Sequence, residues 1–135
     1  MNSLKNCFGL FVFVLSLFTG GSSHAQVNKV ADADSTAEER NQVSKQIIQL
    51  RDTISVKIIS LNNQLTSAAP VNKPIVEKAT RDMKFYQAQL DKGLDEIIST
   101  KVWQPDIRKR STRLLSDMRE KFKVTEKELE KIGYQ

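Results

Sequence analysis

The chain has 135 residues, of which 21 are Lys or Arg, 16 are Asp or Glu, one is cysteine and one is histidine, for a formal net charge of +5. One cysteine excludes an internal disulfide framework, and one histidine leaves little for zinc binding or imidazole catalysis. The mild positive excess is compatible with an anionic partner, although solvated surfaces alone often carry as much.

The first 25 residues have the organisation of a secretory signal peptide. Lys5 precedes an uncharged apolar run of 11 residues at 8–18, and the small-residue stretch TGGSSHA at 19–25 follows it. Ala25 would be the last residue before the cut. A membrane-spanning helix needs about 20 apolar residues, so a permanent anchor is the weaker alternative.

Removal of this leader would change the chemistry that the chain offers. Cys7 and His24 would leave with it, and Lys5 would leave too, so that 20 basic residues remain against 16 acidic ones, a formal +4. Cys7 precedes the apolar run, whereas a bacterial lipoprotein cysteine follows it, so a lipid anchor is not expected. We therefore predict an exported, periplasmic or secreted chain of 26–135 without thiolate or imidazole groups.

The mature chain begins with a polar stretch at 26–34 that lacks periodicity, and we interpret it as a flexible lead. Ser35 and Glu38 then have the spacing of a helix-capping box. Residues 43–53 and 54–64 repeat their apolar positions every eleven residues, which keeps one stripe nearly parallel to a helix axis. The stripe consists of Val43, Ile47, Leu50, Ile54, Ile58, Leu61 and Leu65. It predicts a long, straight helix over 35–67.

Two further segments repeat the helical period. The second stripe consists of Ile75, Ala79, Met83, Tyr86, Leu90, Leu94 and Ile97, and it predicts a helix over 73–100. Gly93 lies inside that helix, at a cost of about 1 kcal/mol relative to alanine. The third stripe consists of Ile107, Ser111, Leu114 or Leu115, Met118, Phe122, Thr125, Leu129 and Ile132. It predicts a helix over 105–133 that Gly133 ends.

These elements predict an all-α fold, an elongated antiparallel three-helix bundle over 35–135 with up-down-up direction and short loops. The first helix has more apolar residues than one stripe needs, because Ile48, Val56 and Ile59 lie beside it. We expect this helix to be central and to contact both others through its wide apolar face. The alternative is that the surplus face meets a second copy or another protein.

The densest charge cluster lies at the start of the third helix. Its cations would face the positive end of the helix dipole, which is mildly unfavourable, so something should compensate them. The cluster consists of Arg108, Lys109, Arg110 and Arg113. One interpretation pairs it across the hairpin with Asp91, Asp95 and Glu96. The other is an anionic partner such as a phosphorylated lipid, a polysaccharide or an acidic protein.

Trp103 is the only tryptophan, and it lies in the loop beside that cluster. It either caps the open end of the bundle or, together with the four cations, anchors a partner. No aromatic residues interleave the cations, so a nucleic acid is not an expected partner.

The remaining acidic residues offer no clear catalytic or metal site. Asp91, Asp95 and Glu96 form the closest group, but calcium needs six to eight oxygen ligands and sugar hydrolysis needs a cleft. The chain has no phosphate-binding glycine loop and no G-x-S-x-G motif. We therefore expect no enzyme activity, no metal and no cofactor.

Our leading hypothesis is an exported, non-enzymatic helical scaffold, adaptor or chaperone-like binding protein of the bacterial cell envelope. It would bind a protein partner, or a second copy of itself, through the surplus apolar face. The alternative is a peripheral binder of anionic lipid or polysaccharide that uses the basic cluster.

Overall fold

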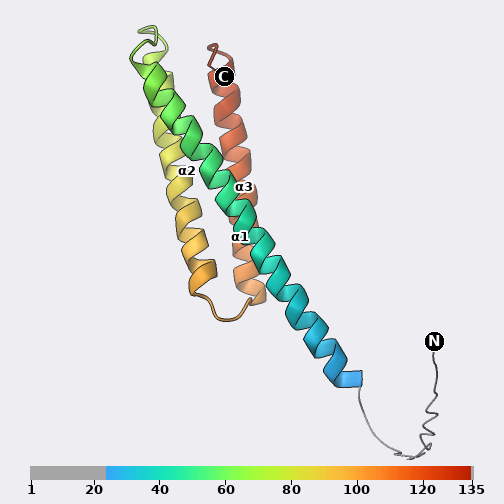
Figure 1. The fold of residues 1–135 in the computed structure, drawn as a ribbon. Coiled ribbons are helices and arrows are strands. Elements are labelled where there is room, and N and C mark those ends of the chain that lie inside the picture. Colours follow the sequence, from blue (N-terminus) through green and yellow to red (C-terminus); the bar gives the residue numbers. More distant parts are fainter. Residues whose placement is uncertain (1–23, 135) are drawn as a thin grey trace, which may run out of the picture.

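A computed structural model describes residues 24–134 as three helices, with no strand in that range. Helix α1 runs from His24 to Leu65, α2 from Lys73 to Ser99 and α3 from Pro105 to Glu130. Figure 1 shows α2 and α3 as an antiparallel hairpin that α1 crosses diagonally, and each helix runs opposite to the one before it. The prediction of an all-α chain with three helices is confirmed. Apart from the start of α1, every helix begins and ends within one turn of its predicted position.

The start of α1 differs from the prediction. The helix begins at His24, so the stretch 26–34, predicted as a flexible lead, is helical, and Ser35 lies inside the helix rather than at its cap. No glycine or proline occurs between Gly21 and Pro70, so nothing in the backbone stops the helix there. The absence of an apolar stripe in 26–34 therefore does not prevent this part from being helical. The predicted leader, apart from its last two residues, lies outside the described part of the chain.

Most of the predicted stripe residues form the core, but Ile75 and Ile107 are only half-buried, and Val76 and Thr80, which the predicted stripe of α2 omits, are buried. The buried residues of α1 are Val43, Ile47, Leu50, Ile54, Ile58 and Leu61. Those of α2 are Val76, Ala79, Thr80, Met83, Leu90, Gly93, Leu94 and Ile97. Those of α3 are Ser111, Leu115, Met118, Phe122, Thr125 and Leu129. Helix α1 packs mostly against α2 and less against α3, so the core is thickest between the first two helices.

Two polar residues of the third stripe are buried with the apolar ones. The Thr125 hydroxyl donates to the carbonyl oxygen of Lys121 at 3.1 Å and lies 3.3 Å from the Tyr86 hydroxyl, which links α3 to α2. The Ser111 hydroxyl is buried and has no hydrogen-bond partner among the described residues. Position on the stripe, rather than polarity, therefore decides which residues of α3 are buried.

Two glycines have distinct structural roles. Gly93 is buried where α2 meets α3, and a Cβ atom at that position would collide with Cδ2 of Leu114. Gly133 has a φ of 81°, its amide donates to the Glu130 carbonyl, and the amide of Tyr134 donates to the Leu129 carbonyl. These are the two hydrogen bonds of a Schellman motif, so Gly133 ends α3 as predicted.

Candidate functional site

The end of the bundle at the α2–α3 loop is held together by side chains of α1. Arg40 donates to the carbonyl oxygens of Ile97 at 2.5 Å and Ile98 at 3.4 Å. These carbonyls belong to the last turn of α2, where the helix dipole is negative and no further backbone amide can reach them. Arg40 therefore caps α2 from a neighbouring helix.

Glu39, the next residue of α1, connects two members of the predicted binding set. Its carboxylate accepts a hydrogen bond from Trp103 Nε1 at 3.4 Å and forms an ion pair with Arg108 Nε at 2.7 Å. Trp103 is half-buried and packs against the hydrophobic core. The indole therefore covers the core at this end of the bundle, and Arg108 is held beside it.

The other three cations differ in how they are paired. Arg110 forms an ion pair with Glu96, as expected across the hairpin. Arg113 Nε lies 3.8 Å from Asp117 Oδ2 on the same helix, and its side chain is 80% exposed. Lys109 is exposed and has no ion pair among the described residues. Arg108 and Arg110 are thus engaged within the bundle, whereas Lys109 and Arg113 face solvent one helical turn apart.

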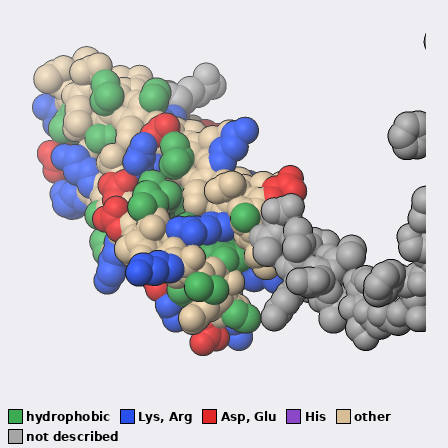
Figure 2. Space-filling model, turned by 60° about the horizontal axis from the view of Figure 1, so that its bottom comes forward, with side chains coloured by type: hydrophobic (Ala, Val, Ile, Leu, Met, Phe, Trp, Pro, Cys, Tyr) green, Lys and Arg blue, Asp and Glu red, His purple; other side chains and the backbone are tan. Residues whose placement is uncertain are grey.

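Sequence reasoning found only part of this pairing. Of the three acidic residues expected across the hairpin, Glu96 is a partner of the cluster. Asp91 pairs with Arg51 at 3.5 Å instead, and Asp95 has no ion pair within residues 24–134. The short loop between α2 and α3 predicts only that α2 lies beside the cluster, so the sequence did not indicate Glu39. In the structure, the direction in which α1 crosses the hairpin brings the N-terminal half of α1 to this end as well. Figure 2 shows Lys and Arg side chains on this side of the molecule interrupted by hydrophobic and acidic ones.

The surplus apolar residues of α1 are exposed. Ile48 is 36% exposed, Val56 is 68% exposed and Ile59 is 60% exposed. Helix α1 contacts both other helices, as expected, but α2 rather than α1 is the central helix. The expectation that the surplus residues make these contacts is wrong, because the single stripe through Ile47 and Ile58 already fills the space between α1 and the hairpin. We call the exposed side of α1 opposite its buried stripe, between residues 41 and 63, the α1 face.

The α1 face is poor in charge. It consists of Asn41, Gln42, Lys45, Ile48, Gln49, Asp52, Thr53, Val56, Ile59, Asn62 and Asn63, of which only Lys45 and Asp52 are charged. On α3, by contrast, 13 of the 17 exposed residues are charged, and the exceptions are Pro105, Thr112, Ser116 and Val124. Helix α3 therefore has the surface of a solvated helix, whereas the α1 face has the low charge typical of an interface core.

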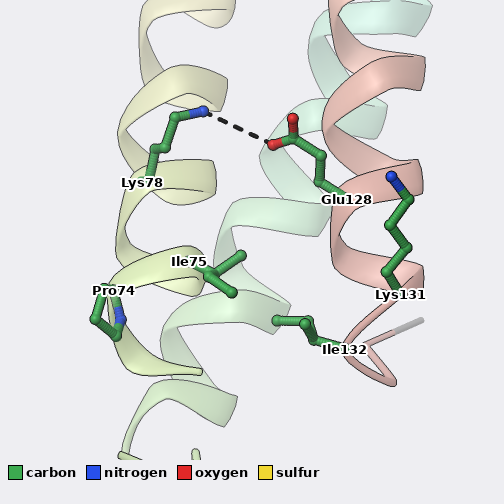
Figure 3. A pocket seen from close by; sticks show the side chains of 6 residues that line it. All are labelled: Pro74, Ile75, Lys78, Glu128, Lys131 and Ile132. Carbon is green, nitrogen blue, oxygen red and sulfur yellow. Dashed lines mark ion pairs between the residues drawn. The ribbon is translucent and has the colours of Figure 1, made fainter. Parts of the chain in front are cut away.

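A groove of about 480 Å³ lies between the start of α2 and the end of α3 (Figure 3). Ile75 and Ile132 point toward each other across it, with Pro74 beside them (Figure 3). Lys78 Nζ lies 3.0 Å from Asp82 and 3.7 Å from Glu128. The hydrogen bond to Asp82, followed by the charges of the two carboxylates, raises the pKa of Lys78 above its ordinary value. The groove thus has an apolar floor and an ion pair at its rim.

Within residues 24–134, no three His, Cys, Asp or Glu side chains are grouped so that they could hold a metal ion. No helix in this range has the length and hydropathy needed to cross a membrane. Comparison with protein-family models, with curated proteins and with solved structures gives no match.

Proposed function

We propose that the protein is an exported, non-enzymatic helical binding protein of the bacterial cell envelope, a scaffold, adaptor or chaperone-like protein, and that it contacts a protein partner through the α1 face. The observation that carries this proposal is the exposure of Ile48, Val56 and Ile59 on a surface with two charges among eleven exposed residues. Apolar side chains scattered singly need no explanation, but a charge-poor strip along one helix is a feature of interaction surfaces.

Export and the lack of catalysis are supported by the sequence. The N-terminal 25 residues have the order of a signal peptide, and its removal takes away the sole cysteine and the sole histidine. The groups left for catalysis are then carboxylates, amines and hydroxyls. Those at the α2–α3 end of the bundle make structural pairs, such as Glu39 with Arg108 and Arg110 with Glu96.

A second candidate function is weak binding of anionic lipid or polysaccharide. It is supported by Lys109 and Arg113, which are exposed on the same face of α3. It has less support than a four-cation site would have, because Arg108 and Arg110 are paired within the bundle. Co-sedimentation with anionic vesicles that weakens with salt and is lost in the Lys109→Glu, Arg113→Glu double variant would support it. Co-sedimentation that is unaffected by both would exclude it.

Site-specific photo-crosslinking in the producing cell tests the leading proposal. A photoreactive amino acid at Val56 samples the α1 face, and the same residue at Val124, which is 52% exposed, samples the charged surface of α3. We expect discrete protein adducts from position 56 and few from position 124. Equal, diffuse labelling at both positions, or none at position 56, would contradict the proposal.

A further inference from the structure

We propose that the side of α3 that faces away from the bundle carries a basic stripe that binds the surface of an anionic lipid bilayer, with α3 lying along that surface. This inference rests on the second candidate function, anion binding at Lys109 and Arg113. It extends that site along the whole helix and names lipid as the ligand.

The basic stripe follows from the helical period of α3. Its seven positions are spaced by three or four residues, and each lies two residues before or after a buried residue, which is about 200° around the helix. They are Lys109, Arg113, Ser116, Glu120, Lys123, Lys127 and Lys131, the last of which directly follows the helix. All seven are exposed, and five are basic. Of the six acidic residues of α3, Glu120 alone lies on the stripe.

The cations of the basic stripe are largely unpaired. Its four lysines have no ion pair among residues 24–134, and the side chain of Arg113, which is 80% exposed, lies 3.8 Å from Asp117. Arg108, at the side of α3, differs because it pairs with Glu39 of α1 at 2.7 Å. Most of the unpaired positive charge of α3 therefore lies on the side that faces away from the bundle.

The shape of the basic stripe suits a flat ligand. Lys109 and Lys131 are 22 residues apart, which is about 33 Å along the axis. Ser116 and Glu120 divide the cations into two groups, one at each end of this length. The positions drift little around the helix, so all the cations point in one direction. A plane of negative charge can therefore neutralise both groups at once.

The side chains of the basic stripe favour a lipid surface over a polysaccharide or a nucleic acid. Four of its five cations are lysines, which act as flexible point charges, whereas anion recognition in a fixed geometry uses the planar guanidinium of arginine. The stripe has no aromatic residue on which a base or a sugar ring could stack. Clusters of about four to eight Lys or Arg residues on a helix are typical of surfaces that bind anionic head groups.

The charge of the basic stripe sets the expected strength of binding. Each basic residue beside an anionic bilayer raises the partition coefficient roughly fivefold. Five basic residues act here against one acidic residue. The stripe has no apolar residue that would hold the protein in the bilayer once its charges are screened. Binding should therefore be measurable at low salt and lost at high salt.

Co-sedimentation of the protein, purified in the form that the cell produces, with vesicles of about one-third phosphatidylglycerol tests the stripe. Lys127→Glu should lower the partition coefficient about 25-fold, because it removes one positive charge and adds one negative charge. Lys127 is 18 residues from Lys109, about 27 Å along the helix and beyond the reach of its charge. Loss of binding at this position therefore shows that the stripe acts over its whole length.

The matched control is Lys45→Glu, the same change of charge at an exposed lysine of the α1 face, which points away from the hairpin. It should lower the partition coefficient less than about threefold, since that side chain lies more than a screening length from α3. Circular dichroism checks that both variants fold. Equal effects of the two variants, no sedimentation of the wild type, or binding that survives about 0.5 M salt would overturn the proposal.

Competition with a soluble polyanion tests the choice of lipid. Polygalacturonate is added to vesicle-bound protein so that polymer and vesicles offer equal numbers of negative charges. The protein should stay with the vesicles, because their head groups present charge over a plane that the whole stripe can meet. Transfer of most of the protein to the polymer would refute the assignment to lipid.

The inference and the candidate function on which it rests fail separately. Vesicle binding that is lost in the Lys109→Glu, Arg113→Glu variant but kept in Lys127→Glu would refute the stripe and leave the two-cation site standing. A wild-type protein that binds neither anionic vesicles nor polygalacturonate would refute both.

Discussion

Replacement of Gly93 by alanine tests how closely α2 and α3 approach each other. Two opposed effects act at this position. Alanine is favoured over glycine inside a helix by about 1 kcal/mol, because it restricts the unfolded backbone. The added methyl group, however, would collide with Cδ2 of Leu114 on the facing helix. Overpacking of this kind typically costs about 1–3 kcal/mol.

The collision involves the end of a half-buried leucine side chain, which has some room to move. We therefore expect the steric cost of Gly93→Ala to be about 1–2 kcal/mol, in the lower part of that range, and the net loss of unfolding free energy to be about 0–1 kcal/mol. In a Leu114→Ala background the colliding atom is absent. There Gly93→Ala should stabilise the bundle by about 1 kcal/mol.

Urea unfolding followed by circular dichroism at 222 nm gives the four free energies of this double-mutant cycle. The expected coupling between Gly93→Ala and Leu114→Ala is about 1–2 kcal/mol, with the alanine at position 93 better tolerated when Leu114 is shortened. Equal stabilisation by Gly93→Ala in both backgrounds would show that the helices are not in close contact at Gly93, and the steric role assigned to that glycine would be wrong.

Three further substitutions test the ends of the helices. Gly133→Ala should lower the free energy of unfolding by about 1 kcal/mol in chemical denaturation, because a Cβ atom disfavours a φ of 81°; no loss would mean that α3 does not end in this motif. Arg40→Gln should cost about 1–2 kcal/mol in the same assay, since it removes a charged donor from the last carbonyls of α2, and Arg40→Lys should recover only part of the loss. Glu39→Gln should shift the fluorescence of Trp103, the only tryptophan, while changing stability by less than about 1 kcal/mol, because the ion pair of Glu39 is partly exposed; an unchanged spectrum would argue against the indole contact.

The buried core could be predicted because the helical period alone places residues on one side of a helix. The stripe that contains Leu115 and Phe122 also contains Ser111 and Thr125, and all four are buried although two are polar. The stop at Gly133 could be predicted for a similarly local reason, since glycine readily adopts the left-handed conformation that ends a helix.

The partners of the basic cluster could only be predicted in part. Glu96 precedes Arg110 along the hairpin, and a short loop requires the two helices to be adjacent. Glu39 belongs to a helix whose crossing angle no periodicity encodes, so its contact with Arg108 could not be found from the sequence. The exposure of Ile48, Val56 and Ile59 was only the alternative to the preferred expectation for the same reason, because composition shows that α1 has apolar residues to spare but not which of them face the hairpin.

The uneven distribution of charge among the three helices also affects the orientation that the bundle would adopt beside a negatively charged surface. Helix α3 has eight basic and six acidic residues, whereas α2 has five of each and the α1 face has one of each, so the positive surplus lies on α3. Close to a layer of negative charge, within roughly 10 Å at moderate ionic strength, this asymmetry exerts a torque that turns α3 toward the layer. A molecule adsorbed in that orientation would keep Ile48, Val56 and Ile59 pointing into the open solution, where a neighbour could still reach them.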